Sequence, residues 1–233
     1  MKRTPGKVIQ LKQSGQQVLC RVKFEDSLSC QPGQYLQCRS AVLEQSCLSE
    51  SLFPIRLEDS EFEALLPDHV GWHVGTEITV RGGLGNGFNL PSTARRISLI
   101  SLDTHPYRLA WLARQIAAYG KDVNLFINQQ ITSFDPMDFP HQMEILPLEH
   151  LEEIYNWSEY VAIDISKNDL ALINQFRLDK LTCPAQILIF TDMPCGGLAD
   201  CGICRITGTN GISLLCKDGP VIDLSQYEYM ISR

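Results

Sequence analysis

The stretch RRISLISLDTHPYRLAWLARQIAAYGKDVNLFIN, residues 95–128, decides the fold class. Its opening, residues 95–102, is an apolar run of the length and composition that predict a buried strand. Residues 106–120 predict a helix that stops at Gly120, and residues 122–128 predict the next strand. The apolar positions of the helix are Leu109, Leu112, Ile116 and Tyr119. A strand, a helix and a second strand in this order indicate a parallel sheet with helices packed on it.

The same alternation continues toward the C-terminus. Residues 148–155 and 167–178 predict two further helices, and residues 160–165 and 185–192 predict the strands that pair with them. Residues 93–191 are therefore expected to form one α/β domain of the nucleotide-binding type.

The first ninety residues have a different pattern. Residues 7–24 alternate well enough for two strands around a turn, and further strands are expected within residues 33–43 and 76–90. Residues 57–75 are the exception and predict a helical turn or an irregular crossing. Residues 1–92 are thus expected to form a small antiparallel β-barrel, which gives a β plus α/β fold class.

Composition limits the classes of partner. The formal net charge of −7 and the lack of a Lys/Arg cluster argue against binding to nucleic acid or to an anionic membrane. No apolar run approaches the roughly 20 residues that cross a bilayer, and the N-terminus lacks the apolar core of a signal peptide. We therefore expect a cytoplasmic protein, in which clustered cysteines bind metal more often than they form disulfides.

Four of the nine cysteines fall close together in residues 192–233, with the spacing C-x5-C-x2-C-x11-C. They are Cys195, Cys201, Cys204 and Cys216. One glycine-rich loop would supply three thiolates and a short hairpin turned at Asn210-Gly211 would supply the fourth, which is the ligand pattern of a [2Fe–2S] cluster. The glycines let backbone N–H groups approach the inorganic sulfides. Residues 192–233 are therefore predicted to be a small cluster domain.

Two other interpretations of these cysteines stay open. A structural zinc site usually shows two C-x2-C pairs, whereas this chain has one, and a disulfide framework fits poorly with an odd number of cysteines. The remaining cysteines stand singly among apolar neighbours and are interpreted as buried bystanders. These are Cys20, Cys30, Cys38, Cys47 and Cys183.

The C-terminal segment resembles a known family. CGGLADCGIC…CKDGPVIDL is similar to the tail of the iron–sulfur, electron-transfer subunit of two-subunit dihydroorotate dehydrogenase. The resemblance implies three parts in this order: a flavin-binding barrel of the ferredoxin-reductase type, a nucleotide-binding domain and a cluster domain. PGQYLQ, residues 32–37, and GGLGNGF, residues 82–88, stand where that family has similar barrel segments. This chain departs from the family in having five residues, not four, between its first two cysteines.

The cofactor motifs that the resemblance implies are degenerate here. The family holds FAD with an Arg-x-Tyr/Phe-Ser motif, and the best match is SLFPI, in which Phe53 supplies the aromatic but Ser51 and Pro54 replace the arginine and the serine. The turn Gly85-Asn86-Gly87 is the other candidate flavin contact. FAD binding therefore stays open. NAD(P) binding is not expected, because no glycine follows the first strand of the α/β domain to make room for a phosphate.

The prediction is an electron-transfer iron–sulfur protein. By resemblance it would pass electrons between a donor and a partner flavoprotein, such as a dihydroorotate dehydrogenase catalytic subunit, in a hetero-oligomer. The first alternative is a self-contained oxidoreductase that uses FAD and is linked to NAD(P)H or ferredoxin. The second alternative is a zinc-stabilised structural subunit. No constellation of nucleophile and base is present in the sequence, so no catalytic residue is predicted.

Overall fold

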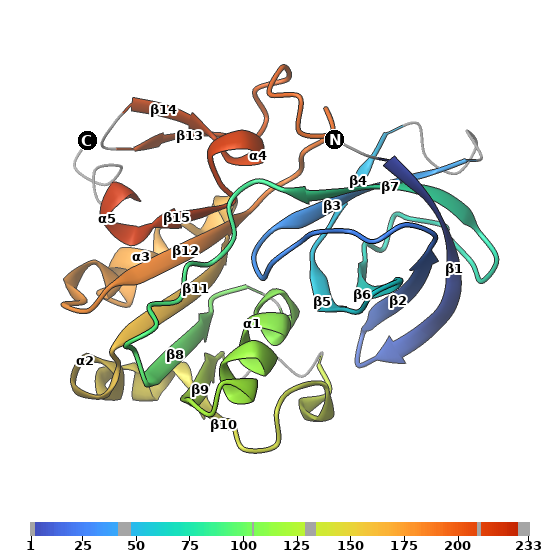
Figure 1. Ribbon diagram of the computed structural model, residues 1–233. Coiled ribbons are helices and arrows are strands. Elements are labelled where there is room, and N and C mark those ends of the chain that lie inside the picture. Colours follow the sequence, from blue (N-terminus) through green and yellow to red (C-terminus); the bar gives the residue numbers. More distant parts are fainter. Residues whose placement is uncertain (1–2, 42–47, 104, 129–133, 209–210, 228–233) are drawn as a thin grey trace.

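The computed structural model describes residues 3–41, 48–103, 105–128, 134–208 and 211–227. Within these ranges the chain forms an N-terminal antiparallel sheet, a mixed α/β sheet and a C-terminal segment that lies against both (Figure 1). No helix of this part of the chain is long and apolar enough to cross a membrane. Of the residues named above, Cys47 and Asn210 lie outside the described ranges.

The N-terminal sheet has seven strands in the order β4-β3-β7-β1-β2-β6-β5, and every pairing is antiparallel. It curls around a core of its own, to which Val8, Val22 and Phe62 belong. The predicted antiparallel β domain is confirmed. The strands are β1 (Arg3–Ser14), β2 (Gln17–Phe24), β3 (Tyr35–Ser40), β4 (Glu50–Leu52), β5 (Pro54–Leu57), β6 (Glu61–Leu66) and β7 (Glu77–Leu84).

Strand β6 corrects one expectation. Residues 57–75 were expected to hold a helical turn, but the burial of Glu61–Leu66 alternates residue by residue, with Phe62, Ala64 and Leu66 buried. This period of two places the apolar side chains on the core face of a strand. Only the part after Leu66 crosses irregularly.

The second sheet has the order β10-β9-β8-β11-β12-β15. Its first five strands are parallel, but the edge strand β15 runs antiparallel to β12, so the sheet is mixed and not purely parallel as predicted. Because β15 belongs to the C-terminal segment, that segment completes the α/β sheet. The strands are β8 (Arg96–Ser101), β9 (Asp122–Ile127), β10 (Glu144–Pro147), β11 (Tyr160–Ser166), β12 (Ala185–Phe190) and β15 (Val221–Asp223).

The helix α1 (Tyr107–Ala118) lies where the sequence predicts it and packs beside β8 and β9 (Figure 1). Leu109, Leu112 and Ile116 are fully buried, and Gly120 takes the left-handed conformation, with φ of 66°, just beyond the helix. Tyr119 is an exception to the predicted apolar face, because it stands at the C-cap and is 63% exposed.

The remaining helices are short. The predicted helix over residues 148–155 is a 3₁₀ segment followed by a single α-helical turn, and that over residues 167–178 is broken in the same way. The C-terminal segment contains a hairpin and two single turns. The bounds are η1 (Pro136–Asp138), η2 (Leu148–Glu153), α2 (Ile154–Trp157), η3 (Lys167–Asp169), α3 (Leu172–Gln175), η4 (Leu178–Lys180), β13 (Arg205–Gly208), β14 (Gly211–Leu214), α4 (Leu215–Asp218) and α5 (Leu224–Tyr227).

Candidate redox site and cofactor crevices

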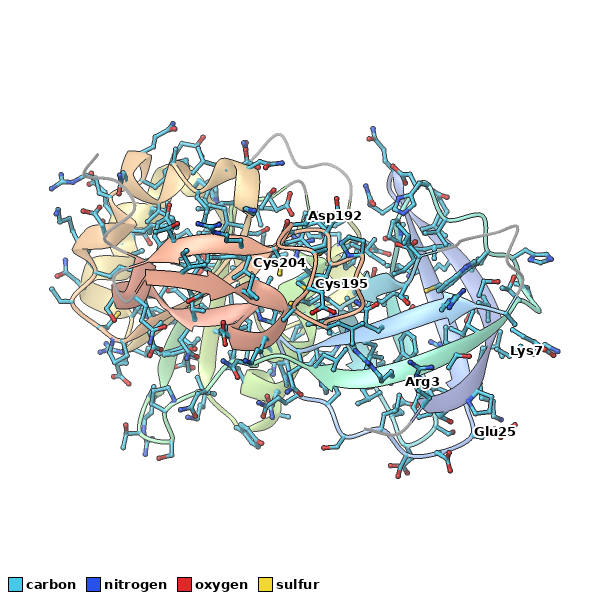
Figure 2. All side chains as sticks on the ribbon, turned by 90° about the horizontal axis from the view of Figure 1, so that it is seen from above. Arg3, Lys7, Glu25, Asp192, Cys195 and Cys204 are labelled. Atoms are coloured by element: carbon cyan, nitrogen blue, oxygen red, sulfur yellow. The ribbon has the colours of Figure 1, made fainter. Side chains whose placement is uncertain are left out.

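The four predicted cysteine ligands meet where the C-terminal segment reaches the β domain. Figure 2 shows Cys195 and Cys204 on the loop that leaves β12, next to the barrel strands. The thiols of Cys195 and Cys201 are within hydrogen-bonding reach of each other, and so are those of Cys204 and Cys216. The sequence-predicted set is thus brought together as two pairs.

The two pairs differ in their exposure to solvent. Cys204 and Cys216 are buried, at 1% and 3% exposure. Cys195 is half-buried and Cys201 is exposed. One side of the cysteine group therefore faces the protein interior and the other faces the surface.

Backbone N–H groups of the loop point at the sulfur atoms. Burial acts to raise the pKa of Cys195, but hydrogen bonds from the N–H groups of Asp200, Cys201 and Leu198 and from the Cys201 thiol outweigh it and lower that pKa to about 6. Gly196 and Gly197 adopt positive φ to turn the backbone in this way. The loop is shaped to stabilise negative charge on sulfur.

Cys216 has the opposite balance. Burial raises its pKa to about 12, with further contributions from the neighbouring thiols of Cys204 and Cys195. The N–H of Ala199 donates to its sulfur. Ala199 is one of two non-glycine residues with positive φ in the described part of the chain, at 66°, which shows how strongly the loop conformation is imposed.

Two barrel side chains fix the loop. The hydroxyl of Tyr35 donates to the carbonyl oxygen of Cys216 at 2.9 Å, and Arg81 donates to the carbonyl oxygen of Gly196. Tyr35 is fully buried, and its pKa is raised by burial and then by the charges of Cys216 and Cys204. The cysteine loop is therefore anchored to strands β3 and β7, which the sequence did not indicate.

The donor set can be compared with the groups it could hold. A [2Fe–2S] cluster takes two thiolates on each of two irons, so it would need both cysteine pairs to act together. A single zinc ion needs three or four ligands that converge on one point. Among the described residues, no three His, Cys, Asp or Glu side chains are grouped closely enough to hold one metal ion.

Phe53 lies between the two sheets, at 6% exposure, with its ring centroid 6.0 Å from those of Tyr35 and Phe190. It lines a cavity of about 200 Å³, together with Ile55 of β5 and Tyr107 of α1. Ligand pockets for molecules of drug size usually measure roughly 300 to 1,000 Å³. A flavin ring at Phe53 would therefore need the two sheets to move apart.

The other candidate flavin residues lie elsewhere, at a joint between the barrel and the C-terminal segment. Asn86 forms a β-bridge with Pro220, and a Cβ on Gly85 would clash with the carbonyl oxygen of Gly219. A Cβ on Gly87 would lie 2.6 Å from the carbonyl oxygen of Pro32. Close packing of backbone thus accounts for these glycines, and the structure does not bring them to the cavity that Phe53 lines.

The crevice at the carboxyl ends of β8 and β11 is where the strand order reverses, the usual nucleotide position in such sheets. Here lies Arg108 of α1, which also lines the cavity beside Phe53. Its Nε donates to Oδ1 of Asp164 at 2.8 Å, its Nη2 donates to Asp103, and its guanidinium lies 4.4 Å above the Phe190 ring. Arg108 is 6% exposed and Asp164 is fully buried.

The charges in this crevice perturb one another. Burial raises the pKa of Asp164 to about 6, although Arg108 opposes the rise. Burial and then Arg108 lower the pKa of His105 to about 3. Neither Arg108 nor Asp164 was predicted from the sequence as part of this crevice. An arginine within the first turn of an otherwise apolar helix was the available signal.

No family model and no curated protein matches this chain in sequence. Its fold, however, is shared with solved structures. It superposes on a chain of the NADH-dependent reduced ferredoxin-NADP oxidoreductase, described for flavin-based electron bifurcation, with a TM-score of 0.70 and 12% identity over 95% of this chain and 88% of that chain. Five per cent of 233 residues is about 12, so this superposition includes most of residues 192–233.

Two reductases give shorter superpositions. The ferredoxin reductase in carbazole 1,9a-dioxygenase matches with a TM-score of 0.67 and 12% identity over 82% of this chain and 70% of that chain, and it has also been solved in an FAD apo form. The ferredoxin-NADP+ reductase from Plasmodium falciparum matches with a TM-score of 0.57 and 9% identity over 81% and 96%. The chain therefore has the fold of these ferredoxin reductases.

Proposed function

We propose that this chain is an electron-transfer protein in which Cys195, Cys201, Cys204 and Cys216 hold a [2Fe–2S] cluster. The observation that carries the proposal is the arrangement of the four thiols as two pairs under a loop whose N–H groups point at sulfur. When bound, such a cluster accepts and donates single electrons.

The chain's own residues supply the environment. The N–H groups of residues 198–201 stabilise negative charge on the thiolates, and Tyr35 and Arg81 hold the loop on the barrel. Cys201 lies at the surface, and the same loop also exposes the apolar side chains of Leu198 and Ile203. This edge is the natural approach for an electron-transfer partner.

The family resemblance of the C-terminal segment suggests what that partner is. We infer a flavoprotein catalytic subunit, such as that of a dihydroorotate dehydrogenase, bound in a hetero-oligomer with the cysteine loop at the interface. The net charge of −7 repels polyanions, so it does not support a nucleic acid or an anionic membrane as the partner.

A second candidate is a complete flavin-linked oxidoreductase. The structural neighbours favour it over a relay that has no flavin, because they are ferredoxin reductases and one was solved in an FAD apo form. Phe53, between the two sheets, is the position from which a flavin would be contacted. The buried ion pairs of Arg108 at the usual nucleotide position argue that such an enzyme would take its electrons from ferredoxin and not from NAD(P)H.

Anaerobic purification followed by a visible spectrum separates the candidates. A [2Fe–2S] protein absorbs broadly in the visible and bleaches with dithionite, whereas FAD adds its own bands and is released by acid. Iron without flavin supports the relay, and iron with flavin supports the second candidate. A colourless protein that contains stoichiometric zinc contradicts both.

A further inference from the structure

A cavity separate from the crevices above lies between the outer face of the barrel and the cysteine loop. Its volume is about 460 Å³, within the range of small-molecule sites. Arg3, Arg39 and Arg81 line one side, and Cys195 and Gly196 line the other. Figure 2 shows Arg3 on the barrel and Cys195 on the loop that faces it. We call this space the arginine cavity.

The sheet register explains why three arginines meet. Arg3 of β1 is paired with Arg81 of β7, and Arg81 is also paired with Gln37 of β3. Arg39 is two residues beyond Gln37 on the same strand, so its side chain points to the same face. The three guanidinium groups therefore come from three adjacent strands and are held on one surface.

Among the described residues that line the arginine cavity, only the Cys195 thiol, with its lowered pKa, opposes the positive charge of the three arginines. No Asp or Glu is among the described residues that line it. No ion pair of Arg3, Arg39 or Arg81 occurs within the described part of the chain. The Nε of Arg81 is buried without a hydrogen-bond partner. On a chain with a net charge of −7, this local concentration of positive charge favours an anionic ligand.

The base of the cavity holds a second unsatisfied group. Gln37 is only 5% exposed, and its Nε2 donates to the hydroxyl of Ser51 at 2.6 Å, but its Oε1 has no partner. That oxygen lies 3.7 Å from the position a Cβ on Gly196 would take. A buried acceptor without a donor is costly, so a ligand with a hydroxyl or an N–H at this point would be stabilised.

We propose that the arginine cavity binds a small organic oxyanion, a phosphate monoester or a carboxylate, that also carries a hydrogen-bond donor. Arg3 and Arg39 bind the anionic group, Arg81 closes the site at the loop, and Gln37 accepts from the donor. The hollow shape and the buried amide favour a small molecule over acidic side chains on a protein surface. A [2Fe–2S] cluster at Cys195 would add negative charge beside this cavity and weaken anion binding, so the affinity is compared between samples of known iron content.

The test measures binding of inorganic phosphate, phenyl phosphate and a hexaglutamate peptide to the whole purified chain by titration calorimetry. Phosphate and phenyl phosphate are expected to bind saturably and less tightly as salt increases. Arg39→Ala should weaken that binding about 10- to 100-fold, because it removes a charge-assisted hydrogen bond. Arg39 is exposed and takes part in none of the loop contacts, so the fold should survive.

Arg56→Ala is the matched control. It removes the same charge from another exposed barrel arginine, which pairs with Glu58 away from the cavity, and should leave the affinity unchanged. The proposal is overturned if neither phosphate compound binds, if only the peptide binds, or if Arg56→Ala weakens binding as much as Arg39→Ala does. Iron content is recorded on the same samples, so failure of the cluster assignment is seen independently of failure of the anion site.

Discussion

Replacement of Arg108 by methionine tests how strongly its buried ion pairs stabilise the crevice between β8 and β11. The guanidinium is nine-tenths buried and pairs with both Asp103 and Asp164, so its removal leaves two buried carboxylates without their counter-ion. Breaking a buried ion pair by removing one partner costs about 3–5 kcal/mol. The loss of the contact with the Phe190 ring adds to this cost.

The free energy of unfolding that Arg108→Met loses should depend on pH. The folded-state pKa of Asp164 is about 6, above its ordinary 3.8, so its ionisation already lowers the stability of the folded protein as pH rises through this interval. Arg108 limits that rise, and without it the pKa of Asp164 moves higher still. The variant should therefore lose more stability at pH 7 than at pH 5, by at most about 1.4 kcal/mol per pH unit for each proton involved. Asp103 and His105 are the other titratable groups in contact with this site.

Urea unfolding at the two pH values measures the effect. Arg96→Met is the control, because Arg96 pairs with Glu159 at the surface, where the pair is expected to contribute less than about 1 kcal/mol. Adding Asp164→Asn to Arg108→Met should recover part of the loss at pH 7. A loss for Arg108→Met no larger than that of the control, or one independent of pH, would refute the stabilising role of these buried ion pairs.

Two further predictions concern the contacts that hold the C-terminal segment. Gly85→Ala should destabilise the protein by at least about 2 kcal/mol, because Gly85 has φ of 69° and no room for a Cβ. The control Gly71→Ala should cost little, because no atom lies within 4 Å of the added Cβ. Equal unfolding midpoints for the two variants would contradict the close packing at Gly85. Tyr35→Phe should lose about 1 kcal/mol and increase amide hydrogen exchange around Cys216, since it removes the hydroxyl that donates to that carbonyl. The comparable variant Tyr160→Phe should leave exchange in the cysteine loop unchanged.

The fold was predictable wherever the hydrophobic period was long and unbroken. The strand and helix within residues 95–118 were predicted because their apolar residues are buried on one core. The stretch Glu61–Leu66 was not, because two glutamates beside alanine and leucine suit a helix locally, and only pairing with β2 makes them a strand. Likewise, three residues of β15 carry no signal for joining an edge in the antiparallel direction.

The candidate site was predictable as a set of cysteines but not as an environment. Spacing alone brought Cys195 and Cys216 into one group, because a loop and a hairpin return the chain to the same place. The anchors Tyr35 and Arg81 are about 180 and 115 residues distant in sequence from the atoms they hold, so no local pattern could link them. The predicted flavin contacts do not lie together: Phe53 is between the two sheets, whereas Gly85 and Gly87 pack against backbone at the joint with the C-terminal segment. A glycine required for backbone packing cannot be told from one required for cofactor binding by sequence alone.

Iron and acid-labile sulfide content of two cysteine variants tests the central claim most directly. Cys204 is a predicted ligand and Cys20 is a buried thiol of the barrel core, so Cys204→Ser and Cys20→Ser make the same chemical change at two buried sites. We expect about two iron and two sulfide per chain in the anaerobic wild type. Cys20→Ser should retain both and Cys204→Ser should lose both. Full iron in Cys204→Ser, or loss only in Cys20→Ser, would contradict the assignment of the C-terminal cysteines as the redox site.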